Sequence, residues 1–344
     1  MLADSVIVVD EVHSFDRNLF SALKQFLKTF SVPVLCMTAS LTEMRIQDLK
    51  ERGLQVFPAD PNQFAELKEA ADMPRYQVRV LGGIEEAQAV VKRSLDSERR
   101  VLWVVNRLDT CQELAQRLGA LCYHSRFKLE DRHKKQNEVI ALFKQSEQRG
   151  FAVTTQVCEM SLDLDAQLLI SETSPITSLI QRMGRCNRHA KPGDGKLGKV
   201  YLYRPGSIKP YRQEDLEGLD QFLKAIDGEI ISQTGLQELL QQFGPREVEV
   251  EKYAAFLECG PWAVARENSL VEEQDWTVQA ILDDDLGRYF ELRRERKPID
   301  GLIVPVPRGT AFQDRRVGRF LRVAPSSHYS PEYGFFRQPV ERGK

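Results

Sequence analysis

Three arginines recur at every third position of one short segment, where Arg182, Arg185 and Arg188 surround Gly184. This spacing predicts that the guanidinium groups lie on one face of a helix. A guanidinium keeps its charge and presents a rigid fork of donors that matches phosphate oxygens. The segment is therefore a candidate contact for a triphosphate, whose transfer spreads negative charge over its equatorial oxygens. A solvated basic helix face is the alternative.

Two carboxylates follow a short apolar run near the N-terminus. Residues 5–9 are mostly β-branched and lead directly into Asp10 and Glu11, which is typical of a buried parallel strand with a site at its C-terminal end. One carboxylate of such a pair can hold Mg²⁺, usually through water, and the other can orient or deprotonate an attacking water. An acidic pair that caps a helix is the alternative.

Hydroxyl side chains follow two further apolar runs. Thr38 and Ser40 come after residues predicted as the second strand, and Thr154 and Thr155 open a polar loop that extends to Asp163. Hydroxyls at a strand end suit contacts with phosphates of a nucleotide or of a nucleic-acid backbone. Asp163 could accept a hydrogen bond from a ribose hydroxyl. A polar turn or a helix cap explains the same residue types without a ligand.

The composition limits the class of protein. The 344 residues are 42% hydrophobic and 28% charged, with a net charge of −2, so any nucleic-acid surface must be local. No apolar run could span a bilayer and the N-terminus lacks a secretory signal, which predicts no membrane partner and a cytoplasmic location. Six cysteines without a C-x-x-C pattern indicate reduced thiols and no zinc ribbon.

Strands and helices alternate over the first 205 residues. Strands are predicted at 5–9, 32–37, 101–105, 120–123, 151–154, 168–170 and 199–203, and helices at 16–30, 42–52, 85–95, 110–118 and 129–145. This alternation predicts an α/β fold with parallel strands, whose C-terminal ends carry the polar residues named above. Residues 57–75, which contain three prolines, are predicted to connect a first partial unit to a complete second one.

The remaining residues predict a mixed α/β region. Helices are expected near 214–226 and 236–242, and residues 299–307 are expected to form a turn and an edge strand, because each proline removes a ladder donor. Trp262 and Trp276 are predicted core residues. A basic cluster is interleaved with aromatic residues and consists of Arg308, Arg315, Arg316, Arg319 and Arg322 with Phe312 and Phe320. It could line a nucleic-acid strand or dock a partner, or it could be a solvated face balanced by residues 283–285.

The order of these segments resembles that of superfamily 2 helicases over roughly the first 205 residues. In that family the Asp-Glu strand, the Thr-Ala-Ser strand, the threonine-rich loop and the Gln-Arg-x-Gly-Arg-x-x-Arg segment are motifs II, III, V and VI. A closer resemblance is to the CRISPR-associated helicase–nuclease of type I systems. The residues that carry it are 10–16, 123–127 with Asp131 and Arg132, 156–163, 171–176 and 181–189. The ending Cys-Asn-Arg-His differs from the RNA-remodelling relatives, which tend to carry glycine there.

The resemblance implies a role in ATP hydrolysis for five residues. Asp10 would hold Mg²⁺ and Glu11 would activate water, within a motif that includes His13. Arg185 and Arg188 would be arginine fingers that reach across a cleft between two RecA-like lobes to the γ-phosphate.

Further residues receive supporting roles from the same resemblance. Gln181 and Arg182 would support the fingers, and Asp163 would contact the nucleotide ribose or position its loop. Thr38 and Ser40 would couple hydrolysis to strand movement. The expected contacts to the nucleic-acid backbone, which are independent of base sequence, are Ser125, Arg126, Thr154 and Thr155.

The implied domains are a partial RecA-like lobe 1 at 1–72, a RecA-like lobe 2 at 73–205, and linker helices with an accessory domain at 206–344. The implied cofactors are ATP and Mg²⁺. The implied partners are single-stranded DNA and a CRISPR surveillance complex of the Cascade type.

A helicase motor also needs a phosphate-binding loop, G-x-x-x-x-G-K-[ST]. The near-match at residues 193–200 places Val200 at the hydroxyl position and leads into a predicted strand, so we interpret it as a turn. Met1 lies close to Asp10, so we expect a truncated chain, and a separate chain could supply the loop and a His/Asp nuclease. The leading hypothesis is an ATP-dependent translocase on single-stranded DNA in CRISPR interference. The alternatives are a non-hydrolysing module that binds DNA or the complex, and an RNA-remodelling helicase.

Overall fold

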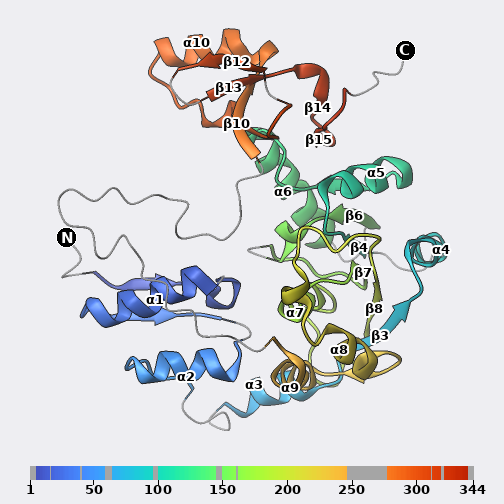
Figure 1. Cartoon of the computed structure of the whole chain (residues 1–344). Coiled ribbons are helices and arrows are strands. Elements are labelled where there is room, and N and C mark those ends of the chain that lie inside the picture. Colours follow the sequence, from blue (N-terminus) through green and yellow to red (C-terminus); the bar gives the residue numbers. More distant parts are fainter. Residues whose placement is uncertain are drawn as a thin grey trace. The chain divides into compact units, whose positions relative to one another are not determined.

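A computed structural model describes residues 5–15, 17–38, 41–58, 64–95, 100–144, 149–159, 162–245, 277–310, 312–318 and 321–339. Contacts divide the chain into two compact units (Figure 1). Unit 1 comprises Met1–Met73, Glu214–Ala225 and Ser232–Gln274, and unit 2 comprises Pro74–Gln213, Ile226–Ile231 and Asp275–Lys344. Among the described residues, no helix combines the length and the apolar character that crossing a membrane requires.

The unit boundaries differ from the three predicted segments in one respect. The change at Met73 lies beside the predicted end of the first segment, but residues 206–344 are shared between both units. Helix α9 (Gln233–Phe243) belongs to unit 1, where the side-chain amides of Gln237 and Gln241 donate to Leu41 O at 3.3 and 3.1 Å. These polar contacts connect segments almost 200 residues apart, which local sequence patterns do not reveal.

Unit 1 contains a two-stranded parallel sheet and its helices. Strands β1 (Ile7–Val9) and β2 (Val34–Cys36) pair in parallel, and the helices are α1 (Arg17–Thr29), α2 (Glu43–Glu51), α3 (Ala65–Asp72) and most of α8 (Leu219–Ile226). Amphipathic α1 buries Phe20 and Leu23 against Val12 and Leu49. The predicted connector at 57–75 is partly wrong, because α3 lies within it. Asp16, Ala39 and Ser40 lie outside the described residues.

The small sheet of unit 1 leaves apolar side chains in solvent. Val6 and Val8 are 68% and 54% exposed, and Leu35 and Met37 are 52% and 41% exposed. Such an uncovered apolar surface is a pairing and aggregation liability.

Unit 2 is built on a seven-stranded sheet with the order β5-β6-β4-β7-β8-β3-β9. Its strands are β3 (Tyr76–Leu81), β4 (Arg100–Val104), β5 (Leu121–Tyr123), β6 (Gly150–Thr154), β7 (Leu168–Glu172), β8 (Gly198–Tyr203) and β9 (Ile230–Ile231). All pairs are parallel except β3 with β9. The helices are α4 (Ile84–Ser94), α5 (Leu108–Leu118), α6 (Leu129–Lys144) and α7 (Ile176–Met183). The predicted α/β class with a parallel sheet is confirmed.

A second, four-stranded sheet in unit 2 has the order β11-β10-β13-β12. It consists of β10 (Thr277–Leu282), β11 (Val304–Pro307), β12 (Phe312–Val317) and β13 (Leu321–Ala324), and it is accompanied by α10 (Leu286–Arg294). β11 is an edge strand, as its prolines predict. The short strands β14 (Tyr329–Ser330) and β15 (Gly334–Phe335) follow. Trp262 and Trp276 lie outside the described residues.

Candidate nucleotide and nucleic-acid site

Four predicted residues meet at the C-terminal ends of β1 and β2. Glu11 has a left-handed backbone, with φ of 53°, and its N–H donates to Asp10 Oδ1 at 2.9 Å. His13 Nδ1 lies 2.9 Å from Thr38 Oγ1 and 3.3 Å from Glu11 Oε2. The structure therefore brings Thr38 to the segment of Asp10, Glu11 and His13, although 25 residues separate His13 from Thr38 in the sequence. Their edge of the sheet is the expected ligand position in a parallel α/β unit.

The residues at this edge fit a magnesium ion that also binds phosphates. Mg²⁺ keeps several waters and is usually held by one or two carboxylates together with substrate phosphates. Asp10 is exposed and supplies such a carboxylate. Among the described residues, no cluster of three or more His, Cys, Asp or Glu side chains could hold a metal ion. Because Mg²⁺ needs only one or two carboxylates beside the phosphates, Asp10 would suffice to hold the ion, and the ion would neutralise phosphate charge.

The arginine segment of unit 2 is not one continuous helix. α7 ends at Met183, and the following residues form a bridge with Ala166 in which Ala166 N donates to Arg185 O and Asn187 N donates to Ala166 O, both at 2.8 Å. Asn187 has φ of 50°, a left-handed value that ends helical geometry. The prediction of three guanidinium groups on one helix face is wrong, because the helix ends at Met183 and Cys186 pairs with Ala166.

Arg182 is buried inside unit 2. Its side chain is 0% exposed, with Nε 2.7 Å from Glu159 Oε1, and its Nη2 donates to Tyr211 OH at 3.0 Å. Burial alone would lower the pKa of Arg182, but the neighbouring Tyr211 and Glu159 outweigh it and raise the pKa. Arg182 therefore ties α7 to the loop after β6. Gln181, beside it on α7, is half-buried.

The side chain of Arg185 holds the same loop by donating to backbone carbonyl groups of that loop. The residue is 7% exposed, its Nη1 donates to Leu162 O at 2.6 Å, and its Nη2 donates to Glu159 O at 2.5 Å. A contact between Arg185 and a phosphate would have to replace these two hydrogen bonds.

Arg188 is the exposed member of the three arginines. Its Nε lies 3.1 Å from Asp163 Oδ1, and the two side chains are 40% and 51% exposed. Its backbone N–H donates to Asp165 Oδ1 at 2.7 Å, which fixes the position of the residue. An exposed ion pair of this kind contributes about 1 kcal/mol or less, so a phosphate can displace Asp163 at small cost.

The residues predicted to contact nucleic acid lie near the ends of β5 and β6, but most are buried. Thr154 and Thr155 are 0% and 2% exposed, and Thr154 Oγ1 donates to Thr155 O at 3.3 Å. Arg126 is 6% exposed, with Nη1 3.1 Å from Asp109 Oδ1. Ser125 is half-buried. In this structure the threonine hydroxyls and the Arg126 guanidinium are not presented at the surface.

A buried polar network near the C-terminal ends of β4, β6 and β7 was not predicted from the sequence. Gln156 Nε2 donates to Asn106 O at 3.0 Å, and Asn106 N donates to Glu172 Oε2 at 2.6 Å. Burial raises the pKa of Glu172. Tyr211 lies 3.4 Å from Gln156 Nε2 as well as bonding Arg182. The signal in the sequence was position, because Asn106 and Gln156 follow the buried strands β4 and β6, and Glu172 ends β7.

The near-match to a phosphate loop is a turn, as predicted. Gly193 and Gly195 have φ of 89° and 63°, and the chain then enters strand β8. A phosphate-binding loop would open a helix.

In the C-terminal basic cluster, Arg308, Arg315 and Arg316 are exposed, and Arg316 is paired with Arg322 across β12 and β13. The predicted acidic counterpart is engaged elsewhere: Asp285 pairs with Lys128 at 3.0 Å, and Asp283 accepts hydrogen bonds from Ser326. Arg319 and Phe320 lie outside the described residues.

Comparison with known proteins identifies relatives of this chain. Residues 97–191 match the family model "CRISPR-associated nuclease/helicase Cas3, C-terminal". A putative CRISPR-associated nuclease/helicase Cas3 from Myxococcus xanthus is 35% identical over 250 residues, which is 71% of this chain and 33% of that protein. The chain thus spans only about a third of the length of this curated relative.

Solved structures share the fold. The crystal structure of T. fusca Cas3 with ADP matches 97% of this chain and 53% of that one, with a TM-score of 0.69 and 17% identity. A chain of a CRISPR RNA-guided surveillance complex, pre-nicking, matches 94% of this chain and 54% of that one, with a TM-score of 0.63 and 19% identity. From the family model, the curated relatives and the shared fold, the chain belongs to the Cas3 family of superfamily 2 helicases and corresponds to their C-terminal portion.

Proposed function

We propose that the chain is part of an ATP-dependent translocase that moves along single-stranded DNA in CRISPR interference. The observation that carries this proposal is the meeting of Asp10, Glu11, His13 and Thr38 in unit 1, together with an exposed Arg188 fixed by its backbone in unit 2. These are the residue types that nucleotide hydrolysis coupled to movement requires. The Cas3 relatives support the same assignment.

Each residue has a distinct part in the proposed reaction. Asp10 holds Mg²⁺, which supplies charge neutralisation on the phosphates, and Glu11 orients the attacking water. Arg188 leaves Asp163 and stabilises the charge that develops on the γ-phosphate. Arg185 either keeps its loop in place or joins Arg188 after its carbonyl partners are released.

The remaining predicted residues keep supporting parts. Gln181 and Arg182 keep α7 in position. Asp163 either accepts a hydrogen bond from the ribose or forms its ion pair with Arg188 again after hydrolysis. Thr38, and Ser40 beside it in the sequence, link hydrolysis to strand movement.

The nucleic-acid contacts are proposed for the ends of β5 and β6. Ser125 is accessible there, and Arg126, Thr154 and Thr155 position the loops. The partners proposed for the whole protein are single-stranded DNA and a surveillance complex of the Cascade type, since one structural neighbour belongs to such a complex.

We further propose that residues 1–344 alone bind nucleic acid without hydrolysing ATP, because their near-match to the phosphate loop is a turn. The test compares ATP hydrolysis by this chain with that of the full-length gene product that contains it, with single-stranded DNA, RNA or no nucleic acid. We expect that only the full-length product hydrolyses ATP and that single-stranded DNA stimulates this hydrolysis. Turnover by the chain alone contradicts the binding-module proposal, and stronger stimulation by RNA favours the RNA-remodelling alternative.

A further inference from the structure

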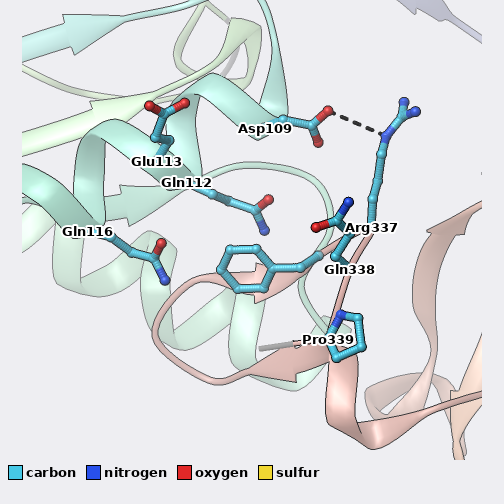
Figure 2. Close-up of a pocket in the computed structure, with 8 residues that line it drawn as sticks. Asp109, Gln112, Glu113, Gln116, Arg337, Gln338 and Pro339 are labelled. Carbon is cyan, nitrogen blue, oxygen red and sulfur yellow. Dashed lines mark ion pairs between the residues drawn. The ribbon is translucent and has the colours of Figure 1, made fainter. Parts of the chain in front are cut away.

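A cavity of about 600 Å³ lies between α5 and the segment that follows β15 in unit 2. Its lining residues are Asp109, Gln112, Glu113 and Gln116 from α5, and Phe336, Arg337, Gln338 and Pro339 from the C-terminal segment. Figure 2 shows Asp109 and Gln112 of α5 pointing toward the C-terminal segment, with the Asp109–Arg337 ion pair drawn between them. None of these residues belongs to the helicase motifs described above.

Three guanidinium groups share the carboxylate of Asp109. Arg126 Nη1 lies 3.1 Å from Oδ1, whereas Arg337 Nε and Arg107 Nη2 lie 3.3 and 3.7 Å from Oδ2. Arg337 lines the cavity together with the carboxylates of Asp109 and Glu113. Arg107 and Arg126 adjoin the cavity through Asp109, and with them the three arginines exceed the two carboxylates by one positive charge. This surplus matches the single negative charge of one phosphodiester.

Arg126 is the buried member of this cluster. Burial lowers the pKa of Arg126, Asp109 raises it, and Arg337 lowers it further. The Nε of Arg126 is buried and has no hydrogen-bond partner among the described residues. Arg337 and Arg107 are 62% and 51% exposed, so their guanidinium groups can reach a ligand.

The C-terminal segment is held firmly enough to form a wall of the cavity. Gln112 Nε2 donates to Tyr333 O at 2.8 Å and to Phe335 O at 3.1 Å, and Phe335 N donates to Arg126 O at 2.8 Å. Phe336 N donates to His328 O at 2.8 Å, so the backbone of the aromatic lining residue is fixed as well. The Gln112 bonds attach the segment to α5, and the Phe335–Arg126 bond attaches it to the Ser125–Arg126 loop, where strand contacts are proposed.

We propose that this cavity binds one nucleotide unit of single-stranded nucleic acid, with its phosphodiester at Arg337 and Arg107 and its base against Phe336. Stacking on an aromatic ring tolerates any base, and a guanidinium fork matches phosphate oxygens. The side-chain amides of Gln116 and Gln338 can donate to or accept from any base edge. The inference rests on the proposed function and extends it, because it assigns a strand contact to the C-terminal segment.

The test measures the binding of fluorescein-labelled oligo(dT) and oligo(rU) of about 12 nucleotides, within the site sizes of single-strand binders, by anisotropy at several salt concentrations. Arg337→Gln should weaken binding several-fold and reduce the slope of log K against log salt by about 0.7, the value for one phosphate contact on a single strand. Asp109→Asn should strengthen binding, because it releases the arginines. Arg293→Gln, an exposed position on α10, controls for the loss of one charge.

The outcomes separate this inference from the proposed function. If wild-type chain binds neither oligonucleotide, nucleic-acid binding by this chain fails and the cavity proposal with it. If wild-type chain binds but Arg337→Gln behaves like Arg293→Gln, the cavity proposal alone is overturned. The cavity proposal is also overturned if Asp109→Asn weakens binding as much as Arg337→Gln does. In that case the Asp109–Arg337 ion pair only keeps the C-terminal segment in place. Tighter binding of oligo(rU), with the same loss in Arg337→Gln, supports the cavity but contradicts a preference for DNA.

Discussion

His13 Nδ1 lies 2.9 Å from Thr38 Oγ1, so a hydrogen bond between side chains joins the acidic segment after β1 to the hydroxyl segment after β2. Glu11 Oε2 is 3.3 Å from the same imidazole nitrogen. A change in the position of Glu11 can therefore reach Thr38 through one side chain. This geometry gives a physical route by which the proposed hydrolytic residues could influence the proposed coupling residue.

The first prediction concerns this hydrogen bond. In the full-length gene product, Thr38→Val should reduce DNA-stimulated ATP hydrolysis by roughly fivefold, because one hydrogen bond is worth about 1 kcal/mol. Thr38→Ser retains the hydroxyl and should keep most of the stimulation. Steady-state ATPase assays with and without single-stranded DNA measure both. Equal stimulation in Thr38→Val and the wild type would show that the bond has no part in coupling.

The second prediction separates the buried arginine from the exposed one. Arg182→Gln should lower the free energy of unfolding by about 3 to 5 kcal/mol, because it leaves the buried carboxylate of Glu159 without its partner. Arg188→Gln should lower it by about 1 kcal/mol or less. Urea denaturation of the chain, followed by circular dichroism, gives both values. Similar losses in the two variants would contradict the buried role of Arg182.

The third prediction tests how closely the C-terminal segment packs on unit 2. Gly334 has φ of 74°, and a Cβ there would lie 2.6 Å from His124 Cε1 and 2.7 Å from Arg126 O. Gly309 has φ of 91° with no atom within 4 Å of such a Cβ. Gly309→Ala should cost about 1 to 2 kcal/mol of backbone strain. Gly334→Ala should cost about 1 to 3 kcal/mol more, from overpacking. Equal losses in denaturation experiments would mean that the close approach to His124 is absent in solution.

The fourth prediction concerns pH. Burial raises the pKa of Glu172, so the folded state binds this proton more tightly than the unfolded state does. The contribution of protonated Glu172 to the stability of the folded state is complete below the ordinary glutamate pKa and is lost as pH rises through the raised pKa. The melting temperature of Glu172→Gln minus that of the wild type should therefore increase between about pH 4.5 and pH 7.5. Glu291→Gln, at an exposed site on α10, is the control, and a difference for Glu172→Gln that does not change with pH would contradict the burial effect.

Much of the fold could be predicted from the sequence because the central strands are buried on both faces. β4 contains the apolar run 101–104 and β7 the apolar run 168–170, and such runs indicate a buried parallel strand. β3 was missed because Gln77 and Arg79 interrupt its apolar residues. The small sheet β10–β13 was largely missed for a related reason, since β12 carries adjacent charges and β10 pairs with strands distant in sequence.

The candidate site was predicted less completely than the fold. The meeting of Asp10, Glu11, His13 and Thr38 follows from the rule that parallel strands present their C-terminal ends at one edge. The spacing of the arginines was misleading, because pairing with Ala166 ends the helix before Arg185. The burial of Arg182 depends on Glu159 and Tyr211, and no local pattern connects these residues.

The fifth prediction addresses the central claim, that this chain supplies the nucleotide-sensing arginine of a DNA-stimulated ATPase. The direct measurement is the rate of ATP hydrolysis by the full-length gene product with single-stranded DNA, for the wild type, Arg188→Gln and the surface control Arg293→Gln. We predict DNA stimulation in the wild type and the control, and a loss of about 10³-fold in Arg188→Gln, the lower end of the range for arginine fingers. Hydrolysis that does not respond to DNA, or that Arg188→Gln leaves unchanged, would contradict the account.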